Sequence, residues 1–232
     1  MHLNRVITNA GAIEVLGGST LTIDPSTIDN DGTIAVVDDN SILVLDTDEV
    51  TNTNGTIRVD AVDNLANTAP TLNLQGNSAI TGTTIDDGTI INHGILEATS
   101  GINIIKNVAT GSNPSDAGEQ FINDGTIAVK FTATLTLDTD VLDNAGGTIN
   151  VHSNATLNLN AVTMAGTLFL NDPSLGLQVA NNAIIGGQLQ STGIGSGATI
   201  QNNLTVGGNT TLANTSVTGT VIVTGTLNVN GN

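Results

Sequence analysis

The sequence predicts an all-β parallel β-helix, or β-solenoid, with coils of about 21–23 residues and little or no helix. Three observations predict it: a glycine-containing turn that returns at this spacing, alternation of apolar and polar residues between turns, and a composition dominated by Thr, Asn, Gly and β-branched residues. That composition favours strands and tight turns over helix. Because 38% of the residues are apolar but only 1% are aromatic, we expect a thin core of Val, Ile, Leu and Ala.

The glycine-containing turn sets the length of one coil. The phrase N-A-G-A-I-E-V, which begins at Asn9, returns as N-D-G-T-I-A-V at Asn30, so that 32 − 11 = 21 residues separate their glycines. The next turn glycine, Gly55, follows after 55 − 32 = 23 residues. A coil of this length cannot bury its own inner row of side chains, so it must stack on neighbours about 4.8 Å away. Roughly ten such coils would form a rod on the order of 50 Å long.

A longer period is superimposed on the coil. The phrase N-D-G-T-I-A-V returns verbatim at 123–129, and L-D-T-D occurs at 45–48 and at 137–140, which indicates a superunit near 93 residues. Each coil is expected to contain a turn, an alternating strand such as 33–36, a second turn and another strand such as 42–45. Leucine-rich and helical repeats are excluded, because neither an L-x-x-L-x-L framework nor a 3.6-residue periodicity is present.

The Asn and Gly residues of the turns are expected to hold the fold. Asn side chains at equivalent corners of successive coils can hydrogen-bond to one another along the stack. Gly can supply a positive φ at corners where a Cβ would be costly. The candidate residues for these turn and ladder roles are Asn9, Gly11, Asn30, Gly32, Gly55, Asn123, Gly125, Asn144 and Gly147.

The chain divides into two regions by composition. Residues 1–172 form an acidic, regular solenoid with loop insertions expected near 61–70 and 107–120, where turn-forming residues interrupt the pattern. Residues 173–232 contain no Asp, Glu, Lys or Arg and are rich in Gly, Thr and Asn. This second region either continues the solenoid more narrowly, which we favour, or forms a fibre segment that winds with two other chains.

The uncharged region carries its own period. Its glycines recur every six residues near the end, and so do Val217, Val223 and Val229. Because it lacks the charges that keep strand edges from pairing, self-association is expected there. The repeat runs from about residue 6 to residue 229 without a recognisable cap, which predicts an excised fragment or a subunit that assembles end to end.

Charge and cysteine content exclude several classes of partner. Four basic residues face 21 acidic ones, and the formal charge of −17 would repel phosphate backbones and anionic lipid, so no nucleic acid and no membrane insertion is expected. The absence of Cys rules out disulfides and thiolate metal sites. Between Met1 and Val15 there is neither a signal-peptide pattern nor a long apolar stretch.

Calcium is the one cofactor that the sequence suggests. In the repeated L-D-T-D phrase, Asp46 with Asp48 and Asp138 with Asp140 are expected to place two carboxylates on one strand face, and hard cations prefer such oxygen ligands. The G-G-x-G-x-D pattern and the EF-hand loop are both absent, and solvated turn carboxylates are the simpler interpretation. Weak calcium binding at these pairs is therefore a hypothesis, and no other cofactor is expected.

Catalysis is not expected. A polysaccharide lyase needs a cluster of bases, and neither the four basic residues nor His2, His93 and His152 cluster in the sequence. A glycoside hydrolase needs two carboxylates at a defined separation, but stacking brings Asp side chains together everywhere and so specifies none. Sugar binding by aromatic platforms is also disfavoured, because we expect the three Phe residues to point inward.

The repeated I-x-N-x-G-T-I-x-V followed by T-L-x-L, at 28–45, at 122–137 and in part at 155–159, resembles the passenger regions of large repetitive bacterial adhesins of the filamentous-haemagglutinin-like and autotransporter kinds. The resemblance implies an extracellular or cell-surface β-helix with a structural or adhesive role. The last thirty residues are also similar to the Gly-Thr-Val repeats of phage tail-fibre stalks, which implies a homotrimer as the alternative. A β-helical carbohydrate-active enzyme is the second alternative. The expected partners are the chain itself, end to end or laterally, and a host or environmental surface or glycan.

Overall fold

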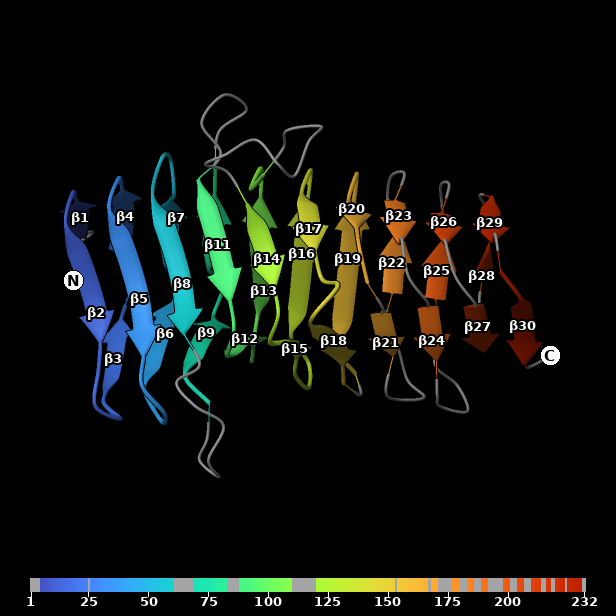
Figure 1. Ribbon diagram of the computed structural model, residues 1–232, viewed down its shortest axis with the longest axis horizontal. Helices are drawn as coiled ribbons and strands as arrows, with labels where there is room; N and C mark the ends of the chain where they lie inside the picture. The colour runs from blue at the N-terminus through green and yellow to red at the C-terminus, as the bar shows by residue number, and fades with distance from the viewer. Residues whose placement is uncertain are drawn as a thin grey trace.

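The computed structural model shows one elongated stack of strands, with the N-terminus at one end and the C-terminus at the other (Figure 1). The residues that it describes contain no helix. The described residues are 5–24, 26–60, 69–82, 88–109, 120–152, 154–166, 168–170, 177–179, 183–185, 189–191, 198–200, 204–206, 210–213, 216–217, 220–223 and 225–230. The expected insertions near 61–70 and 107–120 lie largely outside these ranges. Within them, no helix has the length and apolar character that a membrane crossing requires.

The described strands form three ten-stranded parallel sheets, which we name sheets A, B and C. Sheet A contains β1 (Arg5–Asn9), β4 (Ser26–Asn30), β7 (Glu49–Thr51), β10 (Ala79–Thr81), β13 (Ile102–Lys106), β16 (Thr134–Asp138), β19 (Thr156–Asn160), β22 (Leu177–Val179), β25 (Ala198–Ile200) and β28 (Ser216–Val217). Sheet B contains β2 (Ala12–Val15), β5 (Thr33–Val37), β8 (Thr56–Asp60), β11 (Thr89–Asn92), β14 (Phe121–Asn123), β17 (Val141–Asp143), β20 (Thr163–Met164), β23 (Ala183–Ile185), β26 (Leu204–Val206) and β29 (Val221–Val223).

Sheet C contains β3 (Thr20–Ile23), β6 (Ile42–Asp46), β9 (Thr71–Gln75), β12 (Ile95–Ala98), β15 (Thr126–Val129), β18 (Thr148–Val151), β21 (Leu168–Leu170), β24 (Leu189–Ser191), β27 (Thr210–Ala213) and β30 (Leu227–Asn230). Strands therefore pass from sheet A to B to C and back to A in every coil. The fold is a parallel β-helix, as the sequence predicts.

Each coil has three strands, and the expectation of two was wrong. The strand that the pattern did not separate is the one in sheet A, such as β4, which runs directly into the next Asn-Asp-Gly turn. Three corners follow from three faces. We call them the AB corner, the BC corner and the CA corner, after the sheets that they join.

The core is a column of aliphatic side chains that pair with their equivalents one coil away. In sheet A, for example, Ile7 pairs with Ile28, and Ile28 with Val50. Most of the inner row is almost fully buried, and among the side chains that the structure describes it includes one aromatic residue, Phe121, which is 1% exposed. Stacked β-branched and leucine side chains fill a narrow interior because each strand contributes only alternate residues to it.

The internal repeat does not return to the same face of the rod. N-D-G-T-I-A-V at 30–36 joins β4 of sheet A to β5 of sheet B, but at 123–129 it joins β14 of sheet B to β15 of sheet C. L-D-T-D likewise ends β6 of sheet C at 45–48 and β16 of sheet A at 137–140. The superunit thus spans ten strands, which is three coils and one further face.

The last coil is narrower than the others. Val206 of β26 pairs with Val223 of β29, only 223 − 206 = 17 residues away. Val217, Val223 and Val229 lie in β28, β29 and β30, on three successive faces of this coil. The six-residue period therefore corresponds to one strand and one corner of a single chain.

Candidate functional site

The corners carry two ladders of buried Asn side chains. The first ladder lies at the AB corner, where Asn9 Nδ2 donates to Asn30 Oδ1 over 2.7 Å and Asn30 Nδ2 donates to Asn52 Oδ1 over 2.6 Å. These three residues lie at or just beyond the ends of β1, β4 and β7. Each amide is thus both a donor and an acceptor along the stack, which satisfies polar atoms that the corner buries.

The second ladder lies at the BC corner. Asn92 Nδ2 donates to Asn123 Oδ1 over 2.6 Å, and Asn123 Nδ2 donates to Asn144 Oδ1. These residues lie at or just beyond the ends of β11, β14 and β17. Asn9 and Asn30 are therefore on a different corner from Asn123 and Asn144, and Asn52 and Asn92 belong to the ladders although the sequence analysis did not select them. Gly follows Asn52 three positions later and Asn92 two positions later, a spacing that could have identified both residues.

The turn glycines serve close approach between coils. Gly11, Gly32, Gly55, Gly125 and Gly147 do not have a positive φ, so the expected reason for Gly at these positions was wrong. A Cβ on Gly55 would collide with the carbonyl oxygen and Nδ2 of Asn30, and a Cβ on Gly147 with the same atoms of Asn123. Gly allows the coil above to pass directly over a ladder residue.

The two ladders begin differently. Asn9 Oδ1 accepts a hydrogen bond from the backbone N–H of Gly11 over 3.2 Å. Asn92 Oδ1, in contrast, is buried without a hydrogen-bond partner. Val59 lies beneath Asn92 in the register of β8 and β11 and offers no donor. The second ladder thus starts on an unsatisfied acceptor.

The L-D-T-D phrase builds the same corner twice. Thr47 has a left-handed φ of 63°, and the chain turns so that Asp48 is buried and its Oδ2 accepts the backbone N–H of Asp46 over 2.9 Å. The two aspartates are therefore not side by side on one strand face. Asp46 stays near the surface, where its carboxylate accepts hydrogen bonds from Thr47 Oγ1 and Gln75 Nε2.

The second copy of the phrase repeats this geometry at the AB corner, whereas the first copy lies at the CA corner. Thr139 has a φ of 59°, and buried Asp140 accepts the N–H of Asp138 over 3.0 Å and that of Val108 over 2.8 Å. Asp138 lies 3.3 Å from Lys106 Nζ and accepts a hydrogen bond from Asn160 Nδ2. These carboxylates cap backbone N–H groups at corners.

Calcium binding at these aspartates stays a prediction. In the described ranges, no group of three or more His, Cys, Asp or Glu side chains is placed to hold a metal ion. A cation at either pair would have to compete with the donors that now occupy the carboxylate oxygens and recruit further oxygen ligands.

The outer faces carry ion pairs that join neighbouring coils. Arg58 lies 2.6 Å from Asp60 and 3.9 Å from Glu14, two coils away, and its side chain covers Ala35, which pairs between them and is fully buried. Lys130 lies 3.6 Å from Glu97. His93 and Asp124, both half-exposed, approach to 3.6 Å.

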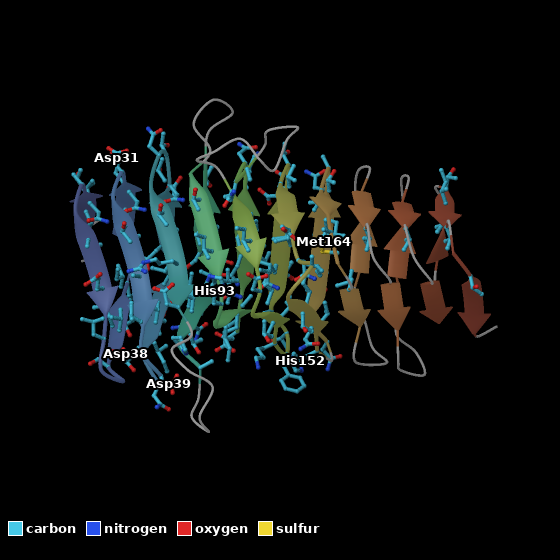
Figure 2. The ribbon with its side chains drawn as sticks, viewed as in Figure 1. Asp31, Asp38, Asp39, His93, His152 and Met164 are labelled. Atoms are coloured by element: carbon cyan, nitrogen blue, oxygen red, sulfur yellow. The ribbon has the colours of Figure 1, made fainter. Side chains whose placement is uncertain are left out.

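One aromatic side chain points outward, contrary to expectation. Phe131, at the CA corner between β15 and β16, is 59% exposed, and its ring centroid lies 5.9 Å from that of His152 at a 46° tilt. His152 lies near the lower edge of the rod in Figure 2. The side chain of Phe169 is outside the described part of the structure. An exposed Phe beside an imidazole is a possible contact for a ligand, and the sequence pattern alone did not distinguish it from a core residue.

Comparisons of the chain with protein-family models, with curated proteins and with solved structures found no match.

Proposed function

We propose that the chain is a structural and adhesive segment of an extracellular or cell-surface fibre, in which stacked coils form a stiff rod and its outer surface makes contacts. The observation that carries the proposal is the uninterrupted pairing of strands in all three sheets, from β1 to β28, β2 to β29 and β3 to β30. Ten coils spaced about 4.8 Å apart give a rod on the order of 45 Å long.

The ladders and the ion pairs between coils support a load-bearing role. Backbone hydrogen bonds in three sheets tie each coil to the next, and buried side-chain amides add a further tie between the coils of Asn9, Asn30 and Asn52 and between those of Asn92, Asn123 and Asn144. Such a rod should resist bending because its coils are paired on three faces around the axis, so bending in any direction would stretch the hydrogen bonds of at least one sheet. The strongly acidic composition favours solubility and repulsion from anionic surfaces over catalysis.

Self-association belongs to this proposal. The charges that separate copies from one another lie within residues 1–172, whereas 173–232 has none. Contact between copies, lateral or end to end, is therefore least opposed in the uncharged coils. Ile222, exposed on the outer face of β29, is the apolar side chain that such a contact would cover first.

Electron microscopy of the purified chain at several concentrations, together with its mass in solution, tests the proposal. We expect rods of about 45 Å as single particles or as filaments that lengthen with concentration. A compact particle would contradict the rod. A homotrimer would instead favour the phage tail-fibre stalk, whose main support, the six-residue period, already has an explanation within one chain.

A further inference from the structure

We propose that the CA corner around Phe131 and His152 is a binding site for a neutral saccharide, whose apolar ring face stacks on Phe131. The proposal rests on the adhesive function and names the ligand class for one contact. It starts from the contrast between two phenylalanines, since Phe121 is buried in the core and Phe131 is 59% exposed.

The fold does not require an aromatic residue at this position. Four corners share one turn, in which the fourth residue donates its N–H to the carbonyl of the first: Ser19 to Leu16, Ser41 to Asp38, Ala133 to Lys130 and Ala155 to His152. The second residue forms the tip, and it is Gly17 in the first of these turns, Asp39 in the second and Phe131 in the third. Because a glycine, a carboxylate and an aromatic ring all occupy the tip, the turn forms without an aromatic residue at this position.

The ring is held rather than loose. The turn is closed by the 3.0 Å bond from Ala133 N to Lys130 O, Ala133 is buried, and Thr132 adopts a φ of 65°. The left-handed φ belongs to the turn itself, since Gly18, Asn40 and Asn154 adopt it at the same position of the other three turns. On the neighbouring coil, the His152 ring supports one side of Phe131. A preorganised platform loses little freedom on binding.

The surroundings select a neutral ligand with an apolar face. The face of an aromatic ring is electron-rich and attracts the C–H groups that line one side of a pyranose. The formal charge of −17 disfavours sialylated or sulfated glycans, and Lys130, next to Phe131 in the chain, is paired with Glu97, which leaves little net charge beside the ring. His152 lies beside the ring of Phe131, and the exposed Asn154 belongs to the same turn as His152.

Saturation-transfer NMR of the full chain with methyl β-D-galactopyranoside at millimolar concentration tests the site, with 3′-sialyllactose as the anionic probe. We expect transfer to the pyranose C–H protons, at least tenfold weaker for the sialylated sugar. The variant Phe131→Asp copies the tip that Asp39 forms at the BC corner, so it should fold normally and lose the signal at least tenfold. His152→Ala should weaken it less, because the platform remains.

A matched control moves the ring instead of removing it. Asp39→Phe adds an aromatic tip at the BC corner, where no His152 supports it, and in the Phe131→Asp background it should restore little of the signal. An unchanged signal in Phe131→Asp, or no transfer with the wild-type chain, would overturn the proposal. If Phe131→Asp alters sedimentation but not sugar binding, the corner is a contact between copies and the saccharide site is wrong. Rods seen in micrographs of every variant keep these outcomes separate from failure of the fibre proposal.

Discussion

The two Asn ladders are the same device built on different faces of the rod. The first, through Asn9, Asn30 and Asn52, lies at the AB corner, and the second, through Asn92, Asn123 and Asn144, lies at the BC corner. In each ladder the first two Asn residues end a strand and the third directly follows one. A turn glycine lies two positions after the first Asn, two after the second and three after the third. The comparison teaches that a corner's sequence determines its chemistry, whichever two sheets it joins.

The ladders differ where each begins. Gly11 N–H satisfies the first acceptor of one ladder, whereas the first acceptor of the other, Asn92 Oδ1, has no partner. An unsatisfied buried oxygen costs roughly 1–3 kcal/mol. The middle residues of the two ladders should therefore contribute equally to the stability of the fold, whereas the first residue of the second ladder should contribute less than that of the first.

The middle residues should give the largest effect. Asn30→Leu and Asn123→Leu each remove a donor and an acceptor from a fully buried chain of amides, and we expect each to lower the free energy of unfolding by about 3 kcal/mol. Urea denaturation followed by circular dichroism measures the loss. Thr22→Val, on the exposed face of β3, is the control and should change stability by less than about 0.5 kcal/mol. Unequal losses for the two Asn variants would break the equivalence of the ladders.

The glycines above the ladders should come next. Gly55→Ala and Gly147→Ala force a Cβ onto the carbonyl oxygens of Asn30 and Asn123, and overpacking of this kind costs about 2 kcal/mol. Gly11→Ala is the matched control, because a Cβ there meets nothing within 4 Å. In thermal melts, Gly11→Ala should lower the melting temperature only slightly, whereas Gly55→Ala and Gly147→Ala should lower it strongly. A mild effect at Gly147 alone would show that the BC corner is looser.

The capping aspartates compare the two L-D-T-D corners. Asp48→Asn and Asp140→Asn replace a carboxylate that accepts backbone N–H groups with an amide that also presents a donor, and we expect a loss of about 1.5 kcal/mol for each. Asp140 accepts the N–H of Val108 in addition to that of Asp138. Asp39→Asn, on the exposed tip, serves as the control. Equal stability of all three variants and the parent would refute the capping role.

A smaller effect tests the unsatisfied end directly. Val59→Asn places a donor beneath Asn92 Oδ1, whereas Val36→Asn, one coil lower in the same register, faces Val59 and gains nothing. Both variants lose apolar burial, but we expect Val59→Asn to be more stable than Val36→Asn by about 1 kcal/mol. Chemical denaturation of the pair measures the difference, and the reverse order would mean that Asn92 Oδ1 is satisfied in another way.

Calcium should produce the smallest change. If the L-D-T-D pairs bind the ion weakly, adding millimolar calcium should raise the melting temperature by a few degrees, which is the size expected for a gain of about 1 kcal/mol. Chelator should reverse the shift, and Asp46→Asn with Asp138→Asn should abolish it. An unchanged melting temperature in calcium and in chelator would count against the hypothesis.

Much of the fold could be predicted from the sequence because repetition shows itself in a fixed spacing. The spacing of Gly11, Gly32 and Gly55 revealed the coil, but it could not show how many faces a coil has, because β4 merges with its turn. The sequence also did not show that Asn30 and Asn123, in identical phrases, lie at different corners of the rod. Identical phrases suggest identical corners, and only the count of intervening strands, which depends on coils of unequal length, shows otherwise.

The outward side chains were harder to predict than the core. Alternation within a strand assigns inner and outer rows, but Phe131 lies in a turn, where the period of two does not apply. Burial of Asp48 was equally hidden, since only the left-handed φ of Thr47 directs its carboxylate inward. Corners, unlike strands, place side chains through individual dihedral angles that composition does not reveal.

The ten-strand superunit affects how contacts could be shared along the rod. Since ten strands are three coils plus one face, a tip residue and its counterpart in the next superunit, such as Asp39 and Phe131, lie on adjacent corners. Duplicated tips therefore wind around the axis instead of forming a row. Two successive copies of a tip border one face of the rod, so a flat surface could contact both, whereas a third copy, on the remaining corner, would be reached only by a ligand that wraps or branches around the rod.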